Sequence, residues 1–224
     1  IGIKTLKPFK INKNINKAIN QIAEVNKKIL DNKLFPITLG GEHSITPGCI
    51  KPFVKKYKKL TLLHFDAHAD LRESYAGEKF SHASAIKRCL DHDNVSVVSF
   101  GIRNISAEEI PILNRNKKRI NIYWAKDKKK WNLKKFKNQI KNKDVYITFD
   151  VDGLDSSIMP ATGTPEPGGI FWDEALEIIK IACKNSRIVG ADVNELSPIK
   201  GFNSYNFLVA KLVYKILSYK YLLK

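Results

Sequence analysis

Leu62–Asp70 reads Leu-Leu-His-Phe-Asp-Ala-His-Ala-Asp and combines the features of a central strand with those of a metal site. Its first half is an apolar run of the kind that forms a buried central strand, and its second half carries Asp66, His68 and Asp70. In an extended backbone successive side chains alternate, so we expect these three to point to one side. Two carboxylates and an imidazole there favour a hard or borderline divalent ion, such as manganese. The alternative is an acidic turn exposed to solvent.

The length and composition are those of one globular domain. At 224 residues the chain can bury one sizeable core, so we expect a single domain over residues 1–224. No apolar run approaches the length of a membrane span, so we expect no membrane partner. Cys49, Cys89 and Cys183 form no Cys-x-x-Cys pair, which argues against a disulfide framework or thiolate zinc site and fits a reducing cytoplasm.

The charge is unusual, because Lys and Arg number 39 against 22 Asp and Glu, a net charge of +17. Nucleic-acid binding is one interpretation, since Trp131 and Phe136 lie within the basic stretch 126–137. No recognised nucleic-acid motif accompanies the charge, however, so we expect a solvated lysine surface and no nucleic-acid partner. Such a surface repels a cationic small molecule at long range unless acidic groups in a cleft reverse the field.

Segments typical of strands and helices alternate along the chain, which predicts parallel strands joined by right-handed crossovers. We therefore expect an α/β fold, a three-layer αβα domain with a mainly parallel central sheet. Besides the central strand, we expect strands at residues 34–39, 95–100, 120–124, 145–149 and 187–192, the first of them buried. Helices are expected at residues 14–30, 44–57, 81–89, 133–140, 173–184 and 207–219, with Ser44 as an N-cap and another helix opening at Ser106.

Ligand-type residues follow several of these strands. His43 comes after the first strand, and Asp150 and Asp152 repeat the spacing of Asp66 and His68. Functional groups gather at the carboxyl ends of parallel strands, so we expect these side chains to meet. Two imidazoles and four carboxylates exceed what one divalent ion needs, whereas two ions carry the positive charge that four carboxylates neutralise. Such a pair lowers the pKa of water and positions hydroxide for attack.

Five ordered motifs resemble the signatures of the ureohydrolase family, which includes arginase and agmatinase. They are GGEHS at residues 40–44, FDAHAD at 65–70, FDVDGLD at 149–155, TGTPEPGG at 162–169 and DVNELSP at 192–198. The resemblance runs from about Leu34 to the C-terminus and implies an arginase-like fold. Family members have a further strand and helix before the region of Ile15, so we expect the chain to lack that N-terminal segment. The resemblance also implies a homo-oligomer, a trimer or hexamer.

The resemblance implies two Mn²⁺ ions as cofactors and a role for each candidate ligand. One ion would be bound by His43 and Asp70, the other by His68 and Asp152, and both would be bridged by Asp66 and Asp150. Hydroxide would attack the guanidinium carbon of a small cationic guanidino substrate, giving a tetrahedral intermediate that collapses to urea and an amine. Asp70 would also hold and relay the hydroxide proton. Glu195 would pair with the guanidinium, and His82 would shuttle protons or contact the substrate tail.

Two loops indicate the substrate. LRESY at residues 71–75 and FSHAS at 80–84 look like the agmatinase branch, so we expect hydrolysis of agmatine to putrescine and urea, a step of polyamine biosynthesis. Arg72 could meet a carboxylate, which keeps guanidinobutyrate open as a substrate. Arginase and formiminoglutamase activities also remain alternatives, and a basic binding protein without turnover is the alternative from another class.

Several neighbours of the candidate ligands have supporting roles in this interpretation. We expect His64 to be structural and Glu42 to support the site rather than to bind an ion. We also expect Asp155 to order the loop after Asp152, and Glu166 to belong to a Pro/Gly loop that shapes the site.

Overall fold

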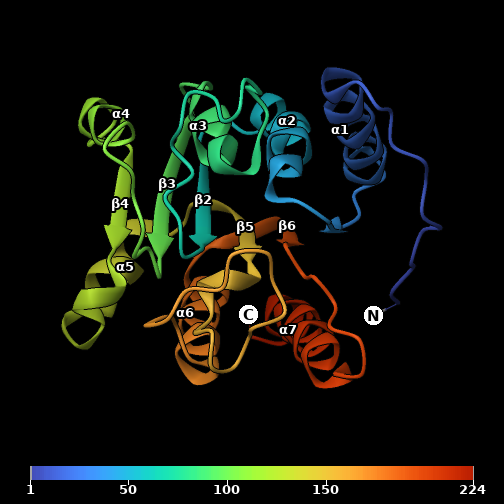
Figure 1. The fold of residues 1–224 in the computed structure, drawn as a ribbon. Coiled ribbons are helices and arrows are strands. Elements are labelled where there is room, and N and C mark those ends of the chain that lie inside the picture. The colour runs from blue at the N-terminus through green and yellow to red at the C-terminus, as the bar shows by residue number, and fades with distance from the viewer. Residues whose placement is uncertain (1, 224) are drawn as a thin grey trace.

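The computed structural model describes residues 2–223 and is built on one central sheet (Figure 1). The strands are β1 (Ile37–Leu39), β2 (Leu60–Phe65), β3 (Val95–Phe100), β4 (Ile120–Tyr123), β5 (Asp144–Asp150) and β6 (Arg187–Asn194). They lie in the order β1-β6-β5-β2-β3-β4, and every neighbouring pair is parallel. The predicted parallel sheet is therefore confirmed, with β2 inside it between β5 and β3.

Helices cover both faces of the sheet, which confirms the three-layer αβα arrangement (Figure 1). They are α1 (Ile15–Asp31), α2 (Thr46–Lys56), α3 (Ala85–Leu90), α4 (Ile110–Arg115), α5 (Leu133–Ile140), α6 (Trp172–Asn185) and α7 (Asn203–Leu222). Residues of α1 to α4 pack in one core with Leu62 of β2, and residues of α5 to α7 pack in the other with Leu63. Adjacent strand residues thus enter opposite cores, as the alternation of an extended backbone requires.

No helix within residues 2–223 is both long enough and apolar enough to cross a membrane.

The first strand differs from its prediction. A buried strand was expected over residues 34–39, but β1 is a three-residue strand at the edge of the sheet, and Leu39 is 65% exposed. It pairs with β6 through Ile37, Thr38 and Leu39. Strand β1 is less buried than expected because an edge strand has a neighbouring strand on one side only. The apolar run in the sequence does not show that the strand lies at the edge.

The predicted N-cap Ser44 is also wrong. Helix α2 begins at Thr46 with Ile45 as its N-cap, because His43–Ile45 forms a separate 3₁₀ turn. The Ser44 hydroxyl instead donates to Glu42 Oε2 at 2.5 Å. This turn carries the imidazole of His43 into the interior, where it is fully buried.

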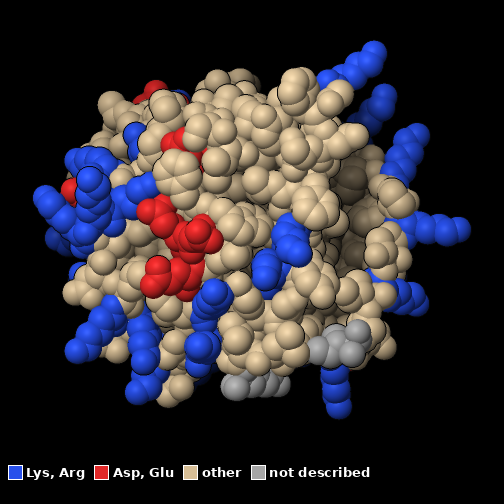
Figure 2. Space-filling view, turned by 90° about the horizontal axis from the view of Figure 1, so that it is seen from below, with Lys and Arg blue, Asp and Glu red and all other residues tan. Residues whose placement is uncertain are grey.

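Basic and acidic side chains occupy different parts of the face shown in Figure 2. On the face seen from below in Figure 2, Lys and Arg side chains project from much of the margin, whereas acidic side chains gather nearer the centre. That distribution is the one expected of a solvated lysine-rich surface.

Candidate metal centre

The loop after β2 carries three of the candidate ligands. Strand β2 ends at Phe65, so Asp66, His68 and Asp70 lie beyond it and not along an extended strand. Asp70 has a φ of 53°, a left-handed conformation that non-glycine residues adopt mainly where the surrounding structure imposes it. The predicted strand alternation is therefore wrong as the cause of their convergence, because the fold of the loop brings the three side chains together.

The loop after β5 supplies the next two candidates. Asp150 is the last residue of β5, and its Oδ1 accepts a 2.9 Å hydrogen bond from the backbone N–H of Asp152. Gly153 lies directly against the other loop, since a Cβ placed on it would be 2.6 Å from the backbone nitrogen of Asp66. The absence of a side chain at Gly153 therefore sets the spacing between the two acidic loops.

His43, in the segment that follows β1, contacts these carboxylates. Its Nδ1 lies 3.0 Å from Asp70 Oδ2, 3.1 Å from Asp66 Oδ2 and 3.5 Å from Asp150 Oδ2. These residues come from three loops at the carboxyl ends of the strands, as a parallel sheet predicts.

The second candidate histidine faces the other side of Asp66. The Nδ1 of His68 lies 3.0 Å from Asp152 Oδ2 and 3.6 Å from Asp66 Oδ1. Asp66 thus directs one oxygen toward His43 and the other toward His68. A carboxylate placed between two imidazoles in this way is suited to bridge two cations.

The close packing of acidic groups shifts the pKa values of the residues in the cluster. Burial and the negative charge of Asp66 raise the pKa of Asp70 to about 7. Burial and the neighbouring Asp152 raise the pKa of Asp150 well above its ordinary value. Burial opposes the charged form of His68, but hydrogen bonds to Asp152 and Asp66 raise its pKa to about 11. A cluster that resists losing its last protons is one that a divalent cation would stabilise.

One buried atom tests whether the cluster fits a cation. The Nδ1 of His43 makes no well-aligned hydrogen bond, although three carboxylate oxygens lie within 3.5 Å of it. Burial opposes the charged form of His43, but Asp66 and Asp70 raise its pKa well above the ordinary value, so without a metal ion this nitrogen holds a proton where a cation would bind. The donor set of imidazole and carboxylate suits a hard or borderline divalent ion. These side chains therefore fit the metal pair that the sequence implies.

His64 lies closer to the cluster than the prediction of a structural residue indicated. Its Nε2 lies 2.8 Å from Asp66 Oδ2 and its Nδ1 lies 3.0 Å from the Ser99 hydroxyl. His64 is fully buried on β2, and burial lowers its pKa even though Asp66 favours the charged form. A neutral His64 that donates to Asp66 would orient this central carboxylate.

The two remaining candidates lie at the rim. Glu195 Oε1 accepts a 2.6 Å hydrogen bond from the backbone N–H of His43, and burial raises the pKa of the Glu195 carboxyl. The imidazole of His82 is half exposed and contacts Glu42 Oε1 at 3.2 Å. Glu42 is the neighbour of His43, so both rim residues are tied to the same turn.

Arg103 is a supporting residue that sequence reasoning missed. Its guanidinium donates to the backbone carbonyls of Gly101 at 2.9 Å, Asp152 at 2.7 Å and Glu166 at 2.8 Å. It therefore fastens the loop after β3 to the loop after β5 and to the Pro/Gly loop. The available signal was an arginine two residues after Gly101, the glycine that follows a buried strand.

The loop that contains Glu166 is held by Asp155, as predicted. Asp155 accepts hydrogen bonds from the backbone N–H groups of Gly168 at 2.7 Å and Gly169 at 2.8 Å. The hydroxyl of Thr164, in the same loop, donates to Asp152 Oδ2 at 3.1 Å. The Pro/Gly loop thereby touches a candidate ligand directly.

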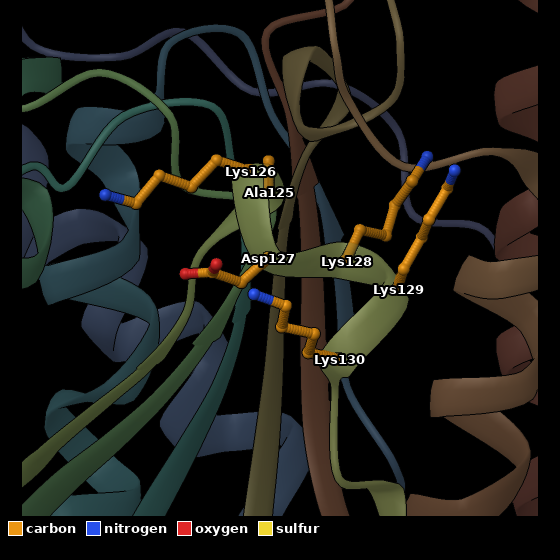
Figure 3. A pocket seen from close by; sticks show the side chains of 6 residues that line it. All are labelled: Ala125, Lys126, Asp127, Lys128, Lys129 and Lys130. Carbon is orange, nitrogen blue, oxygen red and sulfur yellow. The ribbon is translucent and has the colours of Figure 1, made fainter.

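A hollow elsewhere on the surface does not belong to this centre. It measures about 380 Å³ and is lined by residues 125–130, which include none of the candidate ligands (Figure 3). Four of its lining residues are lysines, and Lys128 and Lys129 extend side by side in Figure 3. A cationic guanidino compound would be repelled there.

Comparisons with known proteins agree with this geometry. The family model described as "Arginase family" matches residues 1–218. An agmatinase of Bacillus anthracis is 39% identical over 197 residues, which cover 83% of this chain and 63% of that protein. The mitochondrial guanidino acid hydrolase of Homo sapiens is 34% identical over 212 residues, which cover 91% of this chain and 60% of that protein. The crystal structure of the agmatine ureohydrolase of Thermoplasma volcanium superposes with a TM-score of 0.84 at 31% identity, covering 95% of this chain and 71% of that one.

These matches cover most of this chain but only part of each relative. The chain spans 63% and 60% of the lengths of the Bacillus and human relatives. The family model covers almost all of the chain, and the matched span contains every motif that carried the sequence resemblance. This chain belongs to the arginase family.

Proposed function

We propose that this chain hydrolyses a small cationic guanidino compound to urea and an amine at a centre of two Mn²⁺ ions, with agmatine as the substrate and putrescine as the amine. One observation carries the proposal. Asp66 lies within 3.1 Å of His43 and 3.6 Å of His68, at the meeting point of the acidic loops that follow β2 and β5. Agmatinases among the relatives support the choice of substrate.

The proposed ligands divide into two groups around shared carboxylates. His43 and Asp70 would hold one ion, His68 and Asp152 would hold the other, and Asp66 and Asp150 would contribute to both. When bound, the ions supply hydroxide near neutral pH by lowering the pKa of water, and they supply charge that offsets four buried carboxylates.

The chain's own residues bind the guanidinium and handle its protons. Glu195 pairs with the guanidinium as a two-pronged acceptor, and its hydrogen bond from the His43 N–H fixes it beside the cluster. Asp70 takes the proton of the attacking hydroxyl group. His82, at the rim beside Glu42, carries a proton to the departing amine.

The rim favours a substrate tail without a carboxylate. Arg72 would be the natural partner of such a carboxylate, but its guanidinium is paired with Glu108 Oε2 at 3.1 Å and lies over the ring of Tyr75 at 5.3 Å. Tyr75 in turn contacts the ring of His82 edge-on, with centroids 5.5 Å apart. An Arg72 that is paired with Glu108 is less available to a substrate carboxylate, and this supports agmatine over guanidinobutyrate.

The test is urea release after metal removal and Mn²⁺ reconstitution, with agmatine, arginine and guanidinobutyrate compared side by side. The proposal expects Mn²⁺-dependent urea chiefly from agmatine, and its loss in Asp152→Ala. Urea chiefly from a guanidino acid would keep the chemistry and overturn the substrate. Absence of urea from all three, in protein with two bound ions, would overturn the proposed activity in favour of formiminoglutamate hydrolysis or a binding protein without turnover.

The assembly and location of the protein are parts of the same proposal. We infer a cytoplasmic homo-oligomer, a trimer or hexamer, on the strength of the family resemblance. Light scattering coupled to size-exclusion chromatography tests the assembly, because a monomer of 25.5 kDa is well separated from either oligomer.

A further inference from the structure

Asp192 is a buried acid that the proposed chemistry does not use. It lies on β6 and is 0% exposed, as is Thr148 on the neighbouring strand β5. The partners of its Oδ1 are neutral: Thr148 at 2.7 Å, Thr46 at 3.2 Å and the side-chain amide of Asn194 at 2.6 Å. Burying a carboxylate among neutral groups is costly, so a buried Asp192 at this position requires a functional explanation.

A continuous chain of contacts leads from this acid to His43. Thr148 Oγ1 lies 2.7 Å from Asp192 Oδ1 and 3.0 Å from His43 Nε2. All three side chains are fully buried, so water does not compete for these bonds. His43 is separated from Thr148 by 105 positions and Thr148 from Asp192 by 44, so only the folded sheet assembles the chain.

The direction of each bond follows from the donors available. Asp192 Oδ1 can only accept, so the single hydroxyl proton of Thr148 is donated to it. Thr148 must then accept from His43, which places a proton on Nε2. A metal ion binds the neutral imidazole, in which one nitrogen donates and the other accepts, so a proton kept on Nε2 would leave the lone pair of Nδ1 for the metal ion. That Nδ1 is the atom facing the carboxylates.

We infer that Asp192, acting through Thr148, is a positioning residue that holds His43 with Nε2 protonated and Nδ1 directed at the metal cluster. The inference rests on the proposed function only in taking His43 to be a metal ligand. Hydrogen bonds to the far nitrogen fix the tautomer and ring orientation of metal-binding histidines in general. Here the acceptor is a threonine hydroxyl that a buried carboxylate polarises.

The test compares variants in the full chain by two measurements that do not depend on turnover. ¹⁵N-histidine NMR of the protein loaded with diamagnetic Zn²⁺ reports which ring nitrogen of His43 keeps its proton, and the chain has only five histidines. Mn²⁺ titration, followed by the electron paramagnetic resonance of free Mn²⁺, reports affinity. Thr148→Val removes the hydroxyl at nearly constant volume, Thr148→Ser restores it, and Asp192→Asn removes the charge while its carbonyl oxygen can still accept.

Thr61→Val is the matched control. Thr61 is also a buried strand threonine, and its hydroxyl contacts the Ser96 hydroxyl at 3.1 Å. This variant reports the general effect of deleting a strand hydroxyl from the same sheet, and thermal melts show which variants remain folded.

The inference expects Thr148→Val to weaken Mn²⁺ binding by roughly 10- to 100-fold and to disturb the Nε2-protonated pattern of His43. Thr148→Ser should restore both, Asp192→Asn should weaken binding less than Thr148→Val, and Thr61→Val should match the wild type. Unchanged affinity and an unchanged pattern in folded Thr148→Val would overturn the inference. If Asp192→Asn behaves as the wild type while Thr148→Val does not, the role of Asp192 is overturned. Neither result depends on whether the wild type releases urea, so the two proposals fail separately.

Discussion

The backbone N–H of His43 donates a 2.6 Å hydrogen bond to Glu195 Oε1, although 152 positions separate the two residues in the chain. Glu195 itself has a φ of 66°, the left-handed region that is unfavourable for glutamate. A strained residue is held here by the turn that also carries a candidate metal ligand. The acid that would bind the substrate and the histidine that would bind an ion therefore keep a fixed separation.

Glu195→Gln is expected to lower kcat/KM for agmatine by roughly 10- to 100-fold, because a hydrogen bond to a charged group contributes about 1.5–3 kcal/mol. Glutamine can still accept from the His43 N–H, so Mn²⁺ stoichiometry should not change. Steady-state urea release measures the effect. Glu177→Gln, on the exposed surface of α6, serves as the control. An unchanged kcat/KM would contradict the role given to Glu195.

Gly153→Ala is expected to weaken Mn²⁺ binding and to lower the free energy of unfolding by about 1–3 kcal/mol. The added Cβ would lie 2.6 Å from the backbone nitrogen of Asp66, so one acidic loop must move away from the other. Gly163→Ala is the control, because a Cβ there meets nothing within 4 Å. Urea denaturation and Mn²⁺ titration measure the two effects. Equal behaviour of the two variants would show that the loops tolerate a wider spacing.

Some of this site was predictable from sequence because strand ends and residue types are local features. The apolar run of β2 followed by Asp66 and His68 was enough to predict a cluster at the carboxyl end of a buried strand. The strand alternation used to explain it was wrong, since the chain leaves the strand at Phe65 and turns at Asp70 with a positive φ. An aspartate tolerates both conformations, so its presence does not distinguish them.

The supporting polar groups were missed for a different reason. Thr148 interrupts an apolar strand and Asp192 begins the motif at residues 192–198, but neither feature indicates that the two side chains meet. The order of the strands in the sheet determines which polar side chains come into contact. The sequence predicts that strands and helices alternate, but it does not predict that β6 lies beside β5. The exposure of Leu39 was unpredictable on the same ground, because only the sheet order makes β1 an edge.

Asp155→Asn is expected to destabilise the protein near neutral pH by about 2 kcal/mol. Burial opposes the charged form, but the Ser157 and Gly168–Gly169 donors lower the pKa of Asp155 from 3.8 to about 2. A folded-state pKa below the unfolded one adds stability above pH 4 that is lost as the pH falls toward 2. Denaturant melts of variant and wild type should therefore differ at pH 7 and converge near pH 2.

The exposed Asp93 provides the control for this pH dependence. Asp93→Asn should leave the free energy of unfolding unchanged within about 0.5 kcal/mol at either pH. A difference between Asp155→Asn and the wild type that stays constant from pH 7 to pH 2 would refute the electrostatic origin of the effect.

Glu108→Gln is expected to raise the ratio of kcat/KM for guanidinobutyrate to that for agmatine by roughly two- to fivefold, the range of an exposed ion pair. The variant releases Arg72 from its 3.1 Å contact with Glu108 and makes its charge available to a carboxylate. Glu73→Gln, which breaks the 2.7 Å pair with Arg88, is the control. An equal change of this kcat/KM ratio in both variants would show that the effect comes from the overall charge of the protein rather than from Arg72.

The most direct test of the account is the number of Mn²⁺ ions that one chain binds, measured by titration of the metal-free protein and by free Mn²⁺ in electron paramagnetic resonance. We expect two ions per chain in the wild type and the loss of tight binding of both in the double variant Asp66→Asn with Asp150→Asn, which removes both shared carboxylates. Binding of one ion or none by the folded wild type, or of two ions by the folded double variant, would contradict this expectation.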